Sequence, residues 1–426
     1  MADDVTARSI AEIQAALAAG ESAQALVTPL WERARTLEPK LRAFAHLPEQ
    51  APAALTEGPL AGVTVGVKDL IDTADMPTDY GSAIYMGHRP AADAAIVAQL
   101  KSLGATALGK TVTTEFAWRH PGATRNPWAL DHTPGGSSSG SAAAVAAGLV
   151  TLALGTQTFG SVIRPAAFCG VVGFKPSFGQ LPRDGVHPLS PSLDHVGLFA
   201  RTLEDVAGAF ALLKPDAGAA DVVGAPGALR IAALRPPADV ASAEQVALFD
   251  EACARLRAAG AHVEAIDLTD ALPRLLHVAD TLMGFEAARV FGELRARFPD
   301  KMSASMAAYV DAGKEISEIA HQEAVGAQQG FRMGVGERLE GYDALLTVPA
   351  TGEAPLGLDY TGDPQFCVPW TTLGFPALSL PVGMSSAGLP LGLQLVGRFG
   401  EDRALLAAAQ AFLEACPLHV GRPALG

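Results

Sequence analysis

The stretch from Thr133 to Ser161 reads TPGGSSSGSAAAVAAGLVTLALGTQTFGS. It places two Gly/Ser-rich loops around one Ala-rich helical segment and one short apolar strand. Each loop alone is weak evidence for a site, because Gly and Ser are ordinary turn-forming residues. The two loops together indicate a functional site only if another reactive side chain is expected beside them.

Such a side chain closes the apolar run from Gly62 to Lys68, which reads GVTVGVK. A lysine at the end of a buried strand loses hydration, and desolvation favours the neutral amine over the ammonium ion. A neutral amine can act as a general base. The alternative is a surface lysine that pairs with Asp69, since lysine is rarely buried.

Apolar runs of strand length alternate with helical patterns over the whole chain, which predicts an α/β fold with a mixed sheet. We expect a single large domain, 1–426, divided into an N-terminal helical wrap (1–50), a core with the catalytic residues (58–210), a variable substrate-facing region (215–345) and a C-terminal return to the sheet (346–426). Within these segments the expected strands are 63–67, 105–108, 229–234, 262–266, 344–348, 377–381 and 391–396. The expected helices are two within the first 45 residues, separated at Gly20, followed by 91–103, 242–259, 271–340 with a break at Phe298-Pro299, and 403–413.

Composition restricts the class of protein. Of 426 residues, 49% are hydrophobic and 18% charged, which is typical of a globular domain. The net charge of -14 argues against general binding to nucleic acid or anionic lipid, and no apolar run is long enough to span a membrane. The acidic start MADD does not resemble an export signal, so we expect a cytoplasmic protein. The cysteines, Cys169, Cys253, Cys367 and Cys416, lack metal-ligand spacing and are expected to be buried free thiols.

One tempting motif is rejected on its context. Residues Gly104 to Thr111 match the phosphate-binding pattern G-x-x-x-x-G-K-[ST]. That loop needs a strand before the first glycine and a helix at the lysine, so that helix N–H groups face the phosphates. Here the expected helix precedes Gly104 and the expected strand follows it, which excludes this chemistry.

Together these motifs resemble the amidase signature family. Its core reads approximately G-G-S-S-G-G, T-D-x-G-G-S-I-R and F-C-G-x-x-G-x-K-P. This chain has Gly135-Gly-Ser-Ser, Thr156-Gln-Thr-Phe-Gly-Ser161 and Phe168-Cys-Gly-Val-Val-Gly-Phe-Lys-Pro176. The likeness extends to Gly58-Pro-Leu-Ala-Gly, Gly374-Phe-Pro-Ala and Gly388-Leu-Pro-Leu-Gly-Leu-Gln394, and so covers most of the chain.

The resemblance implies the amidase signature fold, a large mixed β-sheet covered on both faces by helices. It also implies a serine amidohydrolase that cleaves a small linear amide without metal or cofactor. Lys68 is then the base, Ser137 the proton relay preceded by a cis peptide, and Ser161 the nucleophile; the spacing to Ser161 selects Ser137 over Ser138 and Ser139. The backbone N–H groups of Thr158, Phe159, Gly160 and Ser161 are the expected oxyanion hole, and Gly135, Gly136, Ser138 and Phe159 the expected substrate contacts.

The chain departs from the family pattern at three positions. Gln157 replaces the usual Asp, Phe159 replaces a Gly, and Ile163 stands where the Arg is expected, with Arg164 displaced by one. If the family's Asp and Arg pair with each other, losing both together removes an ion pair without stranding a charge. Phe159 at a tight turn lacks the conformational freedom of Gly, and it is also expected to narrow the acyl pocket.

Two other functions stay open. The glutaminase component of a glutamyl-tRNA(Gln) amidotransferase, which is its A subunit, shares these motifs and passes ammonia to a partner protein. A non-catalytic member of the fold is compatible with the altered loop. For the main interpretation we expect a small-molecule amide as partner, no nucleic acid and no membrane, and a homodimer stays open. The substrate pocket is expected within 271–370, where an aromatic set suggests an apolar acyl or aryl group: Phe285, Tyr309, Tyr360, Phe366 and Trp370.

Overall fold

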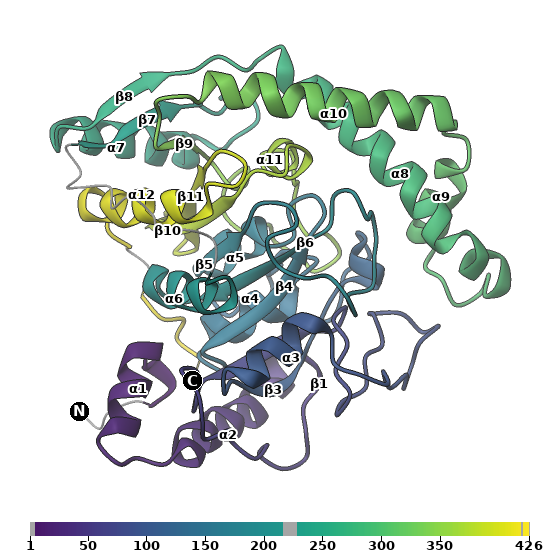
Figure 1. Cartoon of the computed structure of the whole chain (residues 1–426), viewed down its shortest axis with the longest axis vertical. Helices are drawn as coiled ribbons and strands as arrows, with labels where there is room; N and C mark the ends of the chain where they lie inside the picture. The colour runs from purple at the N-terminus through teal and green to yellow at the C-terminus, as the bar shows by residue number, and fades with distance from the viewer. Residues whose placement is uncertain (1–4, 216–227, 419–420, 426) are drawn as a thin grey trace.

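A mixed sheet of eleven strands runs through the computed structural model, which describes residues 5–215, 228–418 and 421–425 (Figure 1). The strand order is β1-β3-β2-β4-β6-β5-β10-β11-β9-β7-β8. The strands are β1 (Phe44–His46), β2 (Thr64–Lys68), β3 (Thr106–Thr111), β4 (Leu152–Gln157), β5 (Val172–Lys175), β6 (His195–Ala200), β7 (Arg230–Ala233), β8 (His262–Ala265), β9 (Ala344–Thr347), β10 (Ala377–Met384) and β11 (Pro390–Val396).

Two parallel pairings position the site. Strand β2 pairs in parallel with β3 on one side and with β4 on the other, with Val67 opposite Leu154. Because neighbouring parallel strands end at the same edge of the sheet, the last residue of β2, Lys68, lies beside the end of β4. The loop that follows β4 carries Ser161.

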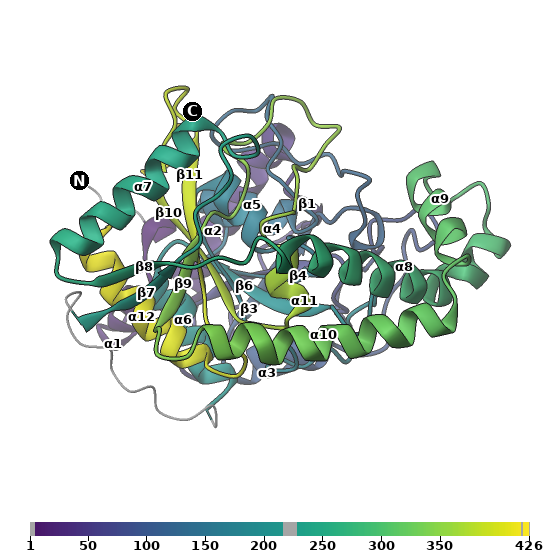
Figure 2. The same cartoon turned by 90° about the horizontal axis from the view of Figure 1, so that it is seen from above.

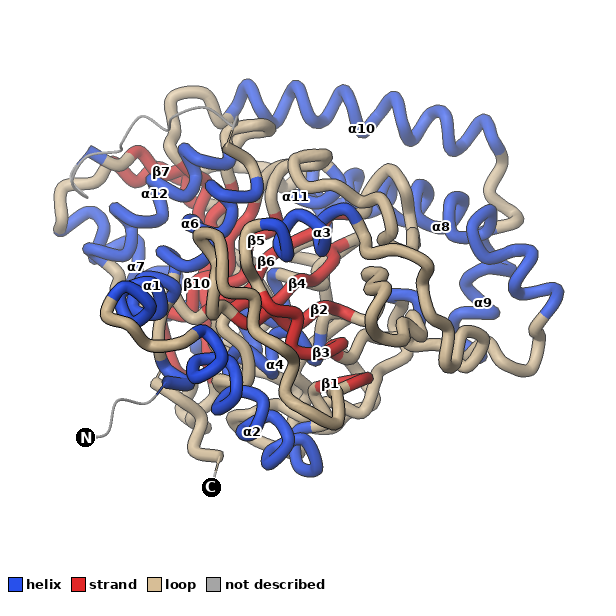
Figure 3. Tube along the Cα trace, turned by 60° about the horizontal axis from the view of Figure 1, so that its bottom comes forward, coloured by secondary structure: helices blue, strands red, loops and turns tan. Residues whose placement is uncertain are grey.

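Helices cover both faces of the sheet, as Figure 3 shows with the strands in red between helices in blue. The helices are α1 (Ile10–Ala18), α2 (Ala23–Leu41), α3 (Ala95–Ser102), α4 (Ser139–Ala146), α5 (Ile163–Cys169), α6 (Leu203–Leu213), α7 (Ala243–Ala258), α8 (Ala271–Arg297), α9 (Ala304–Gly313), α10 (Glu318–Arg338), α11 (Val368–Thr372) and α12 (Asp402–Ala415), with short 3-10 turns at Val5–Ala7 and Glu115–Ala117.

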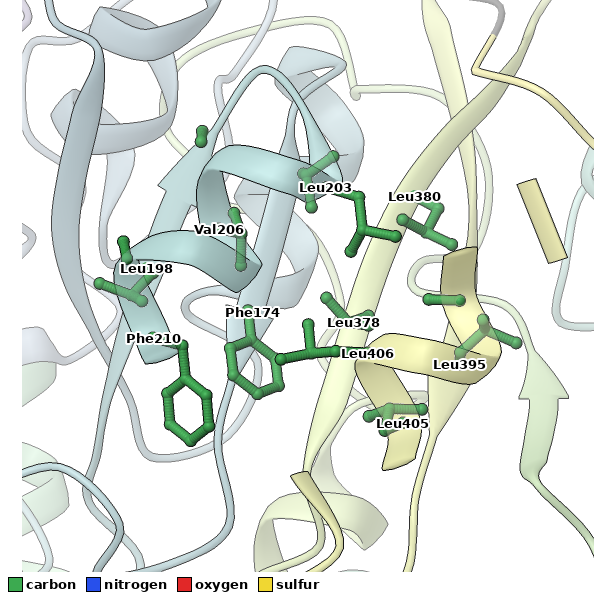
Figure 4. Packing of buried hydrophobic residues seen from close by; sticks show 14 of the residues in the cluster. Phe174, Leu198, Leu203, Val206, Phe210, Leu378, Leu380, Leu395, Leu405 and Leu406 are labelled. Atoms are coloured by element: carbon green, nitrogen blue, oxygen red, sulfur yellow. The ribbon is translucent and has the colours of Figure 1, made fainter. Parts of the chain in front are cut away.

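Alternate residues of the central strand β6 pack against different helices. In β6, Leu198 joins a cluster with Phe210 of α6, whereas its neighbour Phe199 joins Ala142 of α4 and other residues of the opposite face. Figure 4 shows the first cluster, in which Phe174 of β5 and Leu378 of β10 lie near side chains of α6 and α12. The central strands are apolar almost throughout because both of their faces are buried.

Helices α8, α9 and α10 extend to one side of the sheet, and Figure 2 shows them together at that side. Their apolar residues pack on loops that belong to the sheet, since Met283 and Phe291 of α8 cluster with Phe116 and Leu189. This contact brings α8 to the loops beyond the strand ends, where the expected reactive residues lie.

The expected elements agree with the structure in kind and place, except that the helical region 271–340 has a second break, between α9 and α10. Gly104 ends α3 and precedes β3, so the phosphate-loop arrangement is absent there, and Lys110 is a buried lysine that donates to Ile71 O and Thr78 Oγ1. Much of the loop that begins at Lys214 lies outside the described residues. In the described part of the chain, no helix combines the length and apolar character needed to cross a membrane.

Candidate active site

Lys68 is fully buried at the end of β2, so the alternative of a surface lysine paired with Asp69 is wrong. Its Nζ lies 2.7 Å from Ser137 Oγ and 2.6 Å from Thr156 Oγ1. Asp69 pairs with Lys110 instead, at 3.5 Å. Desolvation by burial lowers the pKa of Lys68 well below its usual value, opposed by the negative charge of Asp194. Burial therefore favours the neutral amine of Lys68 over its ammonium form.

Ser137 follows a cis peptide bond from Gly136 and lies at the start of the chain turn into α4. Its carbonyl accepts from the backbone N–H of Thr114 at 3.2 Å, which fixes the loop against β3 and its extension. Its hydroxyl is a donor as well as an acceptor, so it can receive a proton from one side and pass one to Lys68 on the other.

Ser161 lies on the wall of a small cavity, of about 80 Å³, that Ser137 also lines. Three segments make up this wall, joined by Leu189 and by Met283 of α8: the turn after β3, the loop after β4, and the loop before α11. The lining residues are Ala117, Trp118, Arg119, Ser137, Thr158, Phe159, Gly160, Ser161, Arg164, Leu189, Met283, Tyr360, Thr361, Gly362, Asp363 and Pro364.

A wider groove of about 590 Å³ lies between β8, α8 and α10, but none of the expected reactive residues lines it. We place the candidate site in the smaller cavity because Ser137 and Ser161 share its wall and the hydroxyl of Ser137 is bonded to the buried Lys68. Among the described residues, no group of three or more His, Cys, Asp or Glu side chains is arranged to hold a metal ion.

The loop from Thr158 to Ser161 offers backbone donors to the cavity. None of these four N–H groups donates to an acceptor in the described residues, whereas the next two, of Val162 and Ile163, donate to Gln157 Oε1. Unpaired N–H groups beside a nucleophile are what an oxyanion hole requires. Neither Phe159 nor Gly160 has a positive φ, so phenylalanine is tolerated at this turn without backbone strain.

Gln157 caps the helix that follows the nucleophile. Its Oε1 accepts from Val162 N at 2.8 Å and Ile163 N at 3.0 Å, and its Nε2 donates to Thr371 Oγ1 at 2.8 Å. Thr371 Oγ1 in turn donates to Phe159 O. A neutral amide here serves both the helix start and the loop, so Gln157 needs no cation beside it.

Arg164 is buried beside this loop and has no carboxylate within ion-pair distance among the described residues. It donates to Thr361 O at 2.7 Å and to Gly136 O at 2.8 Å, while Nη1 has no hydrogen-bond partner. We expected the family's Asp and Arg to be lost together, and this expectation is wrong for the Arg. A buried guanidinium remains in the site, moved by one residue along α5.

Asp194 holds the loop from Thr158 to Ser161 in place through hydrogen bonds. Its carboxylate accepts from Thr158 Oγ1 at 2.6 Å and from the backbone N–H groups of Leu189 and Ser190. Burial raises the pKa of Asp194 to about 6. This residue therefore ties the expected oxyanion loop to the segment that supplies Leu189 to the cavity wall.

The structure does not bring all expected substrate contacts to the cavity. Phe159 lines it, but Gly135, Gly136 and Ser138 do not. Gly136 O accepts from Arg164, and Ser138 Oγ bonds to the backbone of Thr156, so these residues support the wall from behind. The reason is that the chain turns into α4 directly after Ser137, which directs Ser138 toward β4.

Most of the aromatic set expected to form the pocket packs elsewhere. Tyr360 alone lines the cavity. Phe285 stacks on His321 and Tyr309 on Trp118, while Trp370 lies in the core beneath α10. In this region most of the expected aromatic side chains therefore pack in the interior and do not contact the cavity.

Three further residues around the site were not expected from the sequence: Thr156, Asp194 and the retained cation Arg164. Thr156 lies on β4, which pairs with β2, and Asp194 lies directly before β6, which pairs with β4. Because these strands are far apart in the sequence, only their pairing in the sheet brings the two residues to the site. A usable signal existed for Arg164, because a residue three positions after Ser161 at a helix start remains near the same loop. The four cysteines are buried and free, as expected.

The comparisons with known proteins agree with this geometry. The model of the family described as Amidase matches residues 8–406, and the chain belongs to this family. It is 36% identical, over 86% of both chains, to a Symbiobacterium thermophilum protein named as the A subunit of glutamyl-tRNA(Gln) amidotransferase. Among solved structures it is similar to a protein described as an amidase, with a TM-score of 0.86 and 31% identity over 96% of this chain and 99% of that one. A 6-aminohexanoate cyclic dimer hydrolase has the same TM-score, with 28% identity over 99% of both chains.

Proposed function

We propose that this member of the amidase family hydrolyses the C–N bond of a small linear amide, giving a carboxylate and ammonia or an amine. The observation that carries the proposal is the buried pair of Lys68 Nζ and Ser137 Oγ, 2.7 Å apart, with Ser137 and Ser161 on one cavity wall. A hydroxyl is a weak nucleophile until a neighbouring base takes its proton. The pair supplies that base, and the small cavity suits a substrate with few heavy atoms.

In the first half of the reaction, Lys68 takes the proton of Ser161 through Ser137, and Ser161 Oγ bonds to the amide carbon. The N–H groups of residues 158–161 stabilise the resulting oxyanion. The C–N bond then breaks as Lys68 returns the proton through Ser137 to the leaving nitrogen. In the second half, water attacks the ester carbon, the same relay accepts and returns a proton, and the carboxylate product leaves Ser161 free.

The main alternative is a role as the A subunit of a glutamyl-tRNA(Gln) amidotransferase. The name of the curated relative at 36% identity favours this alternative over the free hydrolase. The same serine chemistry would then act on glutamine, with other proteins of the complex as partners. The structural neighbours described as an amidase and a hydrolase support the free enzyme.

Ammonia release by the purified chain alone separates these functions. We expect turnover of small amides without any added protein, and its loss in Ser161→Ala. Activity on glutamine that appears only when the other amidotransferase components are added would favour the role in that complex. A folded wild type without turnover on any amide, with or without partners, would favour a non-catalytic protein.

A further inference from the structure

The guanidinium of Arg164 lies between the two loops that carry Ser137 and Ser161. On one side, Nη2 donates to Gly136 O at 2.8 Å, directly before Ser137. On the other side, the backbone N–H of Arg164 donates to Gly160 O at 2.9 Å, and a methyl group placed on Gly160 would come within 3.0 Å of Nη1. The cation is thus adjacent to both reacting serines.

The hydrogen-bond partners of this guanidinium are neutral and incomplete. Nε and Nη2 donate to Thr361 O, Thr361 Oγ1 and Gly136 O, while Nη1 has no partner in the described structure. The only acid on the cavity wall, Asp363, accepts from Gln365 N and forms no ion pair with Arg164 among the described residues. Burial lowers the pKa of Arg164, yet an arginine stays charged at working pH.

A buried cation without an anion is unfavourable, and burial normally selects for a paired charge. The cavity wall carries Arg164 and the exposed Arg119 against the single acid Asp363, so its net charge is positive in a chain whose overall charge is -14. An anion that enters the cavity would therefore find a charge partner that the protein itself does not supply. Planar guanidinium and carboxylate groups are complementary in shape.

We propose that the amide substrate carries a carboxylate on its acyl part, and that this carboxylate pairs with Arg164 while Ser161 attacks the amide carbon. This inference rests on the proposed hydrolysis and names its substrate class. The cavity of about 80 Å³ and the closeness of Arg164 to Ser161 favour a short acyl chain, such as the monoamide of a three- to five-carbon dicarboxylic acid. L-Glutamine, which also carries a carboxylate, has the chain length of the longest acid in this range and brings an ammonium group to this positive wall.

The test compares matched amides that differ in one carboxylate. Ammonia release is measured for malonamate against propionamide, succinamate against butyramide, and L-glutamine. We expect kcat/KM to be about 10- to 100-fold higher for the best charged amide than for its neutral counterpart, since hydrogen bonds to a paired charge are the strong ones. In Arg164→Met this ratio should fall to about one, and methylguanidine should restore part of it in Arg164→Ala.

Two controls keep the inference separate from the proposed function. Arg119→Met removes an exposed charge from the cavity mouth and should lower the ratio only slightly, in a salt-dependent way. Calorimetric binding of succinamate to Ser161→Ala, lost in Ser161→Ala/Arg164→Met, detects recognition without turnover. A wild type that cleaves neutral amides as well as charged ones, or an Arg164→Met that lowers both rates equally, overturns the carboxylate assignment alone. Failure of every amide to react would instead count against the hydrolysis.

Discussion

Replacing Gln157 by leucine should loosen the nucleophile loop from within. Leucine is similar in volume to glutamine, so the change removes hydrogen bonds with little change in packing. It leaves the N–H groups of Val162 and Ile163 without an acceptor in a site where both residues are fully buried, and it frees Thr371 Oγ1. A buried unpaired donor costs about 1–3 kcal/mol, so two of them should lower the free energy of unfolding by about 3 kcal/mol.

Urea unfolding of Gln157→Leu measures this loss, with Gln329→Leu on the exposed face of α10 as the matched control. We expect the control to stay within about 0.5 kcal/mol of the wild type. Because the loop proposed to supply the oxyanion donors is anchored through Thr371, kcat should also fall by about 100-fold in Gln157→Leu. A loss of stability below about 1 kcal/mol would refute the assignment of Gln157 as the internal cap of this loop.

Three further outcomes are expected. Because burial lowers the pKa of Lys68 well below its usual value and the neutral amine is the active form, kcat/KM should stay on its plateau as the pH falls through the usual lysine range and decrease only at the lowered pKa; an essential group that titrates near pH 10 would contradict this. Asp194→Asn should move this acid limb to lower pH, because the Asp194 charge raises the pKa of Lys68; a profile that changes in height but not in position would show that Asp194 only positions Thr158. Phe159→Gly should raise kcat/KM for long acyl chains relative to short ones by about tenfold, and an unchanged ratio in a substrate series would mean that Phe159 does not limit the acyl pocket.

The sequence predicts those parts of the fold that depend on local patterns of residues. Where both sheet faces are buried the strands are mainly apolar, so β7, β10 and β11 stand out as short apolar runs, and Gly20 and Gly260 mark helix ends. The order of the strands could not be read this way, because it depends on pairings between segments far apart in the chain. Neighbours such as β5 and β10 are separated by about half of the sequence.

The same distinction holds at the site. The loops that carry Ser137 and Ser161 have a local signature, and a lysine at a strand end has a physical reason to lose its proton. The roles of Gln157 and Arg164 were misjudged, because the sequence shows a missing acid and a displaced cation but not what each side chain contacts. Only the structure shows an amide that caps α5 and a guanidinium with an unused donor group.

The most direct test of the account is the position of a covalent fluorophosphonate adduct. Peptide mapping by mass spectrometry after labelling should find the adduct on Ser161, and Ser161→Ala should not be labelled. Ser137→Ala and Lys68→Met should still carry it on Ser161 but react far more slowly, because the nucleophile is present and its base or relay is not. An adduct on Ser137, or a wild type that remains unlabelled and inactive on every amide, would contradict the assignment of Ser161 as a nucleophile activated by Lys68 through Ser137.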